Sequence, residues 1–305
     1  MHIFLTGATG HIGSAVLAAL IKAGHQVTAI ARDPEKAEKL LAKGATPVIA
    51  ELGLTKMYVP LLKSADAVVH TAFESSPRGV QLDQQSIETM LTAQRDAMAT
   101  DGKARAFVYT SGVWILGRTA KAADEEAPVN PPPHVAWRPA HEDLVLAARS
   151  SGLRPVVIRP GIVYGGGRGI ISDLIKDALN GIIRVVGPGK NRWPCVYDTD
   201  LGDLYVRILE SPAAAGVYHA NDEADERVSD IVEAIAGQVP QRPDIRNMPL
   251  AEARKKLGTY ADALALDQRV RSPRARALGW APSKSSVATS VARLLEQVRG
   301  SKADR

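Results

Sequence analysis

A glycine-rich loop that directly follows an apolar run is the feature that most constrains the fold of this chain. Residues 2–6 read HIFLT, and residues 6–13 read TGATGHIG, after which apolar residues recur at helical spacing. A strand, a tight glycine turn and a helix N-terminus in this order let backbone N–H groups and the helix dipole bind a pyrophosphate. The loop therefore predicts a dinucleotide site. Its expected contacts are Gly7, Thr9, Gly10, His11 and Ile12.

The rest of the N-terminal half alternates between strand-like and helix-like segments. The strand-like runs are continuously apolar and rich in β-branched residues, which is typical of strands buried on both faces of a sheet. They read QVTAIA, TPVIA, DAVVHTA, RAFVYTS and LRPVVIRP. Alternating strands and helices predict an α/β protein with a Rossmann-type, doubly wound parallel sheet.

After Gly165 this alternation gives way to shorter helices and glycine-rich loops. We therefore expect residues 1–165 to form the nucleotide-binding Rossmann domain, with a return segment near 195–215. Residues 166–305 are expected to form mainly a smaller C-terminal domain that covers the substrate.

Composition excludes several other classes of protein. The 305 residues carry a net charge of +5, but the basic residues are spread along the chain without a reader motif, so we expect no nucleic-acid partner. No apolar run approaches the roughly 20 residues that a bilayer needs, and no leader pattern opens the chain. We expect a cytoplasmic protein without membrane contact. The single cysteine, Cys195, predicts a buried structural thiol, and we expect no metal site.

Several motifs together resemble one known family. The glycine spacing is TGxxGxxG, residues 70–72 read HTA, and residues 159–167 read RPGIVYGGG. VYDTDL at 196–201 and LGWAP at 278–282 extend the similarity over nearly the whole chain. This pattern resembles the extended and atypical short-chain dehydrogenases/reductases, the NAD-dependent epimerase/dehydratase-like family. The resemblance implies a nicotinamide cofactor, with Thr71 and Ala72 among its contacts.

The end of the second predicted strand indicates which nicotinamide cofactor binds. An acidic residue there accepts hydrogen bonds from a free ribose 2′-OH, whereas a basic residue accommodates the 2′-phosphate of NADP. Arg32 occupies this position and Lys36 follows in the next predicted helix, which Asp33 can cap with Pro34 as its first residue. The sequence therefore predicts NADP, and Asp33 turned toward the ribose is the alternative. By resemblance, Glu51 and Leu52 are the family's acidic and apolar pair beside the adenine.

The positions at which the resembled family carries its catalytic residues hold other residues here. The family uses a Ser or Thr after the fifth strand, a Tyr, and a Lys four residues later. Its members commonly carry a Glu four residues after that Lys, so Glu142 aligns Arg138 with the Lys and His134 with the Tyr. Gly112 falls at the Ser/Thr position and Ser111 precedes it. The catalytic candidates are Ser111, His134, Arg138 and Tyr164.

These side chains can still perform chemistry. Histidine, with a pKa near 6.5 in model peptides, donates a proton at neutral pH more readily than an unassisted tyrosine. Arg138 stays charged and can hold the ribose hydroxyls or orient a substrate carboxylate. Pro139 favours a helix that begins near Arg138, which leaves His134 in a proline-rich loop, and an exposed loop residue is its alternative interpretation. Tyr164 either offers its phenol to the site or packs against the backbone.

The sequence thus predicts an NADP(H)-dependent oxidoreductase that reduces a small carbonyl or related unsaturated compound. One alternative is a lyase, isomerase or cyclase that uses the same cleft without net redox chemistry. Another is a non-catalytic NADP(H) sensor that binds protein partners. We expect a small-molecule substrate and leave a homodimer open.

Overall fold

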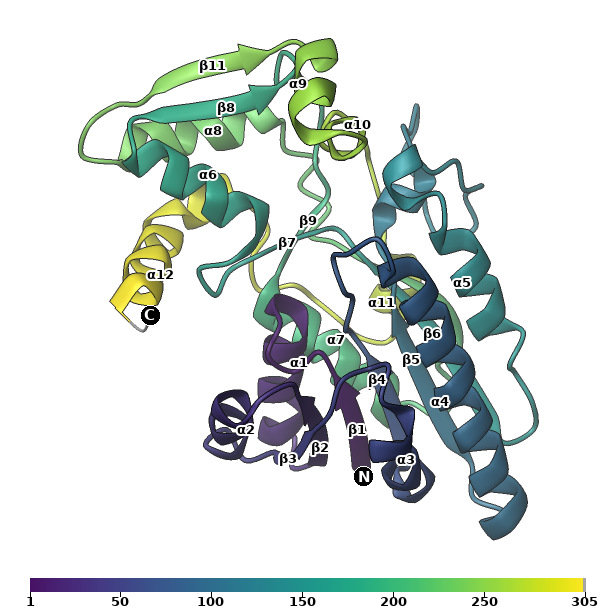
Figure 1. Cartoon of the computed structure of the whole chain (residues 1–305). Coiled ribbons are helices and arrows are strands. Elements are labelled where there is room, and N and C mark those ends of the chain that lie inside the picture. The colour runs from purple at the N-terminus through teal and green to yellow at the C-terminus, as the bar shows by residue number, and fades with distance from the viewer. Residues whose placement is uncertain (304–305) are drawn as a thin grey trace. The chain divides into compact units, whose positions relative to one another are not determined.

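The computed structural model describes residues 1–303, which form two compact units (Figure 1). The first unit contains Met1–Ser111, Trp137–Arg159 and Leu201–Tyr218. The second unit contains Gly112–Ala136, Pro160–Asp200 and the chain from His219 onward.

A seven-stranded sheet organises the first unit and confirms the predicted Rossmann-type fold. The pairings of β3 with β2, β2 with β1, β1 with β4, β4 with β5 and β5 with β6 are all parallel. The strand order reverses between β1 and β4, and open α/β sheets bind their ligands at such a switch point, beyond the carboxyl ends of the strands. Across the sheet the strands are β10 (Gly216–Ala220), β6 (Leu153–Pro160), β5 (Arg105–Thr110), β4 (Ala67–His70), β1 (His2–Thr6), β2 (Gln26–Ala31) and β3 (Thr46–Ile49).

Helices cover both faces of this sheet (Figure 1). On one face, α4 packs against α3 and α5, over a core that includes Phe107 and Tyr109. On the other face, α7 approaches α1 so closely that a Cβ at Gly202 would lie 2.8 Å from the carbonyl oxygen of Ala15. The helical elements are α1 (His11–Lys22), α2 (Pro34–Leu41), η1 (Thr55–Met57), α3 (Val59–Ser64), α4 (Gly79–Asp101), α5 (Arg138–Leu146) and α7 (Asp198–Glu210).

The second unit combines short helices with two small sheets. Strand β7 (Ile162–Tyr164) pairs with β9 (Cys195–Tyr197), and β8 (Ile182–Val186) pairs with β11 (Asp244–Met248). Its core lies among α6, α8 and α12, and Cys195 is buried in it as predicted. The helical elements are η2 (Val113–Leu116), η3 (Pro133–Val135), α6 (Gly169–Leu179), α8 (Val228–Gln238), α9 (Leu250–Leu257), α10 (Tyr260–Leu264), α11 (Pro273–Ala277), η4 (Ala288–Ser290) and α12 (Val291–Ala303).

Among residues 1–303, no helix is both long and apolar enough to cross a membrane. The same residues hold no group of three or more His, Cys, Asp or Glu side chains placed to bind a metal ion.

Candidate functional site

The glycine loop between β1 and α1 leaves no room for side chains. Gly7 has a φ of +74°, and a Cβ there would lie 2.7 Å from both the Ala72 nitrogen and the Thr71 hydroxyl. A Cβ at Gly13 would overlap the carbonyl oxygen of Gly7. The same oxygen accepts a hydrogen bond from the Gly10 N–H at 2.8 Å. The loop is therefore closed tightly onto the end of β4, as backbone approach to a pyrophosphate requires.

The N-terminus of α1 is open to an anion. Its N-cap is Gly10, which supplies no side-chain hydrogen bond, and its first turn contains no acidic residue. The first N–H groups of a helix lack partners within the helix and carry a partial positive charge. Loop and helix together fit the pyrophosphate of a dinucleotide.

The end of β2 carries an exposed cation, whose charge contributes to the lowered pKa of Asp33 and of Glu74. Arg32 is exposed, and within residues 1–303 its guanidinium makes no hydrogen bond or ion pair. Asp33 is engaged elsewhere, because it caps α2 by accepting the Lys36 N–H at 2.9 Å and pairs with the Lys36 ammonium. These hydrogen bonds from Lys36 also hold the pKa of Asp33 below its usual value. The predicted cap with Pro34 at its first position is confirmed. The contact of Arg32 with a 2′-phosphate stays a prediction.

Glu51 and Leu52 follow β3 at the edge of the sheet. The Glu51 side chain is exposed, whereas Leu52 is partly buried and packs against the core of the first unit. The Leu52 carbonyl accepts a hydrogen bond from the Tyr58 hydroxyl at 2.7 Å. Their contact with adenine stays a prediction.

Ser111 lies just beyond the carboxyl end of β5 and has an unpaired hydroxyl. The residue is 6% exposed, and its Oγ has no hydrogen-bond partner among the residues that the structure describes. Its backbone N–H donates to the Ile158 carbonyl at 2.8 Å, which fixes the position of the residue. An unpaired buried hydroxyl at a ligand-binding edge is available to a substrate or cofactor oxygen.

Arg138 is the first residue of α5, where the sequence predicted the helix to begin. Its Nη1 donates to the Thr110 carbonyl at 3.3 Å, one residue before Ser111. The guanidinium carbon lies 4.4 Å from the Trp137 ring centroid and 5.8 Å from that of Phe73. The two rings stack with their centroids 5.0 Å apart. The structure thus brings Arg138 and Ser111 to the same edge of the sheet.

His134 belongs to the second unit and lies in the short helix η3. Its ring is partly buried and contacts the rings of Trp114 and Tyr260, with centroids 6.2 and 5.1 Å away. Nδ1 lies 3.4 Å from the Thr259 hydroxyl. The imidazole is therefore held in place by its neighbours and keeps part of its surface accessible.

Tyr164, also in the second unit, is fully buried. Its ring packs against that of Tyr197 with centroids 5.3 Å apart, and its hydroxyl has no partner among the described residues. Burial raises the pKa of the phenol far above its usual value. This geometry favours the packing interpretation of Tyr164 over the catalytic one.

The sequence did not predict a buried polar network that reaches the start of the glycine loop. Asp83 on α4 accepts hydrogen bonds from Tyr109 at 2.8 Å and pairs with Nε2 of His70 at 3.1 Å and Nδ1 of His141 at 2.7 Å. The other ring nitrogen of His70, Nδ1, lies 2.6 Å from the Thr6 hydroxyl at the start of the loop. Burial raises the pKa of Asp83, but the hydrogen bonds from His141 and His70 outweigh burial and hold the pKa well below the usual value. The network ties the loop to α4 and α5.

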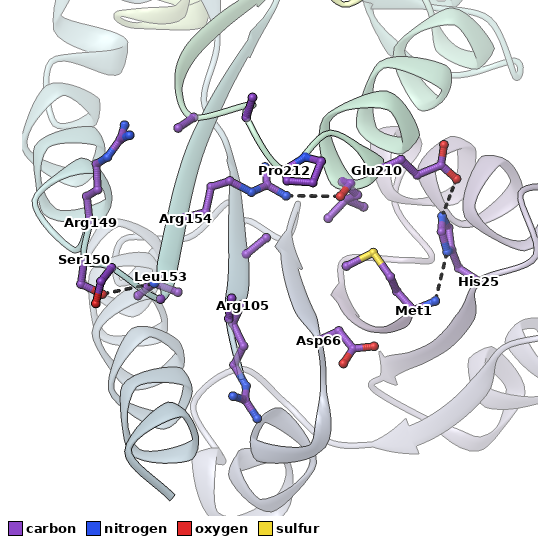
Figure 2. A pocket seen from close by; sticks show the side chains of 17 residues that line it. Met1, His25, Asp66, Arg105, Arg149, Ser150, Leu153, Arg154, Glu210 and Pro212 are labelled. Carbon is purple, nitrogen blue, oxygen red and sulfur yellow. Dashed lines mark hydrogen bonds and ion pairs between the residues drawn. The ribbon is translucent and has the colours of Figure 1, made fainter. Parts of the chain in front are cut away.

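A separate pocket of about 650 Å³ lies at the opposite, amino-terminal edge of the sheet (Figure 2). Residues that precede five of the strands line it, namely Met1, Asp66, Ala104, Gly152 and Ala215. Arg154 in this pocket donates to the carbonyls of Ile208 and Leu209 at the end of α7, and Arg105 pairs with Asp101. Both arginines thus bind groups at the carboxyl ends of helices, α7 and α4. The pocket is distinct from the glycine-loop site.

Comparison with known proteins identifies the family of this chain. Residues 3–221 match the model of the NAD dependent epimerase/dehydratase family. The protein belongs to this family, as its motifs suggested. A relative of 33% identity over 302 residues is an uncharacterised protein of Schizosaccharomyces pombe, with 96% of this chain and 98% of the relative covered.

Two further comparisons concern chemistry and cofactor. A Stigmatella aurantiaca protein named 4-hydroxy-2-methyl-3-oxo-4-farnesyl-3,4-dihydroquinoline-1-oxide ketoreductase is 25% identical over 260 residues, covering 83% of this chain and 78% of that protein. The crystal structure of human epimerase family protein SDR39U1 with NADPH has a TM-score of 0.76 at 20% identity, covering 97% of this chain and 99% of that one. Other solved structures with this fold hold NAD. Proteins similar to this chain thus include NAD(P)-dependent oxidoreductases and epimerases.

Proposed function

We propose that this protein is an NADP(H)-dependent oxidoreductase that reduces a small carbonyl compound. The observation that carries the choice of cofactor is the unpaired Arg32 guanidinium at the end of β2, beside an Asp33 already engaged in capping α2. A guanidinium that makes no ion pair within residues 1–303 can bind a 2′-phosphate. A free 2′-OH would instead call for an acidic residue that accepts its hydrogen bond. The NADPH complex of the human structural relative and the ketoreductase relative support the same proposal.

The residues of the first unit have distinct roles in this proposal. The loop at Gly7 and Gly10 and the N-terminus of α1 bind the pyrophosphate, and Arg32 binds the 2′-phosphate. NADPH, when bound, supplies a hydride to the carbonyl carbon while a proton adds to the oxygen, which gives an alcohol and NADP⁺. The Ser111 hydroxyl donates a hydrogen bond to the carbonyl oxygen and polarises it.

The proton source differs from the tyrosine of the family pattern. We assign it to His134, because its imidazole keeps accessible surface whereas the Tyr164 phenol has none. A positioned general acid of this kind contributes about 10²–10⁴-fold to turnover.

Titration of the protein with NADPH and NADH, followed by nucleotide fluorescence, tests the cofactor proposal. Wild-type protein should bind NADPH more tightly, and Arg32→Ala should remove about 1.5–3 kcal/mol of that preference, as expected for a charge-assisted contact. Arg95→Ala is the matched control, since Arg95 is exposed on α4 and makes no ion pair within residues 1–303. Equal affinities for both nucleotides in the wild-type protein would refute the NADP proposal.

Oxidation of NADPH with a panel of aldehydes and ketones tests the reaction. Turnover with at least one carbonyl compound is expected. Tight NADPH binding without oxidation across the panel, together with a protein partner captured in only one redox state, would instead identify a sensor.

A further inference from the structure

The Arg138 guanidinium is a cation without a counter-ion. It is partly buried, it makes one hydrogen bond, to the Thr110 carbonyl, and no carboxylate within residues 1–303 pairs with it. A guanidinium carries five N–H donors, so most of its hydrogen-bonding capacity faces no protein group. Partly desolvated donors of this kind favour an anionic partner.

Nearby carboxylates are already committed to other donors. Glu142, one turn further along α5, is 2% exposed and accepts hydrogen bonds from Arg159. Asp83 accepts from Tyr109 and is paired with two histidines. Neither carboxylate pairs with Arg138, so its remaining donors are available to an anion from outside the described residues.

Two aromatic rings and a backbone carbonyl restrain the guanidinium. Trp137 and Phe73 are nearly parallel, with 8° between their planes, and Arg138 lies against both. The Thr110 carbonyl further restrains the guanidinium by accepting a hydrogen bond from Nη1. A restrained planar fork is suited to binding a carboxylate through two parallel hydrogen bonds, which a lysine ammonium cannot do.

Two further features lie at this edge of the sheet. The Ser111 hydroxyl is unpaired, and Phe73 is 42% exposed despite its stacking on Trp137. A hydroxyl donor, a cationic fork and an apolar surface thus lie at the same edge of the sheet. These three groups match a carbonyl oxygen, a carboxylate and an apolar substituent on one small molecule.

We infer that the substrate is an oxo acid, whose carboxylate binds Arg138 and whose apolar part lies against Phe73. This inference rests on the proposed reductase function and names its substrate class. The competing role for Arg138 is to hold the hydroxyls of the nicotinamide ribose. The two roles predict different losses when the side chain is removed, because one concerns the substrate and the other the cofactor.

The test compares 2-oxo-4-phenylbutanoate with its ethyl ester as substrates for NADPH oxidation. Wild-type protein should show a kcat/KM about 10- to 100-fold higher for the acid, the range of a charge-assisted bidentate contact. Arg138→Leu should erase this ratio through a higher KM for the acid, while the Kd for NADPH, measured by fluorescence, stays within about twofold. Arg149→Leu is the control, because Arg149 is exposed and has no ion pair within residues 1–303.

Phe73 and the fold are tested separately. Phe73→Ala should raise the KM for the phenyl acid without changing the acid-to-ester ratio, because it removes apolar contact alone. Should Arg138→Leu fail to fold, as judged by circular dichroism, Arg138→Lys keeps the charge and loses the fork, and it should retain only part of the ratio.

The outcomes separate this inference from the proposed function. Equal kcat/KM for acid and ester in the wild-type protein overturns the inference and leaves the reductase function in place. A raised NADPH Kd with an unchanged ratio in Arg138→Leu assigns the side chain to the ribose and also overturns it. If NADPH binds but neither compound is reduced, the carbonyl panel decides the proposed function, and calorimetry with 4-phenylbutanoate and 4-phenylbutanamide decides the inference. Carboxylate binding that depends on Arg138 supports it, and equal binding of acid and amide overturns it.

Discussion

Asp222 in the second unit should make the stability of this protein fall as the pH rises. The residue is 7% exposed, and its Oδ1 accepts the Ala224 N–H at 3.1 Å. Its Oδ2 has no partner among the described residues. Burial, with a further contribution from the charge of Glu226, raises the pKa of Asp222 to about 7. The carboxyl group therefore keeps its proton in the folded chain at pH values where the unfolded chain has lost it.

The sign and size of the effect follow from proton linkage. Between the unfolded pKa of about 3.9 and the folded pKa of about 7, the folded state binds the extra proton, so stability falls with rising pH and stays low above pH 7. Each pKa unit corresponds to about 1.4 kcal/mol, which gives a total loss of about 4 kcal/mol over the whole interval. Asp222→Asn is neutral at every pH and can keep the hydrogen bond from Ala224. Between pH 5.5 and pH 8 its stability relative to wild type should therefore rise by about 2 kcal/mol.

Urea unfolding followed by far-UV circular dichroism at pH 5.5 and pH 8 measures this difference. Asp143→Asn is the control, since Asp143 is exposed on α5 without an ion pair in the described part of the chain, and its effect should be pH-independent within about 0.5 kcal/mol. The reasoning is refuted if Asp222→Asn changes stability equally at both pH values, or if it destabilises the protein more at pH 8 than at pH 5.5.

Two other outcomes follow from the glycine loop and from the second unit. Gly13→Ala should abolish NADPH binding in a fluorescence titration, because the new Cβ overlaps the Gly7 carbonyl oxygen. The control is Gly237→Ala on α8, whose new Cβ meets no atom within 4 Å and should leave binding intact. Undiminished binding by Gly13→Ala would contradict the pyrophosphate role of the loop. His134→Phe should lower kcat by about 10²–10⁴-fold with an unchanged NADPH Kd, whereas Tyr164→Phe should leave kcat within about twofold. The reverse order of effects would move the proton donor to Tyr164.

Local sequence patterns predicted the parts of the structure that local interactions determine. The glycine loop is predictable because a Cβ at Gly10 or Gly13 would crowd the carbonyl oxygen of Gly7, a few residues away. The cap of α2 is predictable from the sequence because Asp33, Pro34 and the Lys36 N–H lie within one turn. Continuous apolar runs predicted the buried parallel strands, since only a strand covered on both faces needs no polar side. The prediction of burial was wrong for β3, which lies at the edge of the sheet and has only exposed and partly buried residues.

The Asp83 network could not be predicted in this way. Its members come from β1, β4, α4, β5 and α5, so their contacts depend on how the sheet is assembled. In the sequence, Asp83 and His141 look like ordinary polar residues on helices, because a helix that packs on a sheet keeps a polar face as well. A carboxylate with three side-chain donors is identifiable only once the tertiary structure is known.

The replacement of the family's Lys and Tyr is better understood as one change than as two. By resemblance, that Lys lowers the pKa of the Tyr, and without a phenol at His134 this requirement disappears. An arginine can then occupy the first turn of α5, where stacking on Trp137 and the bond to the Thr110 carbonyl fix the fork at the edge of the sheet. A permanently charged group there cannot pass on a proton, but it can hold an anion throughout a reaction that adds a proton elsewhere. Substrate binding and proton supply would then reside on different side chains, Arg138 and His134, which is why their substitutions should act on KM and on kcat separately.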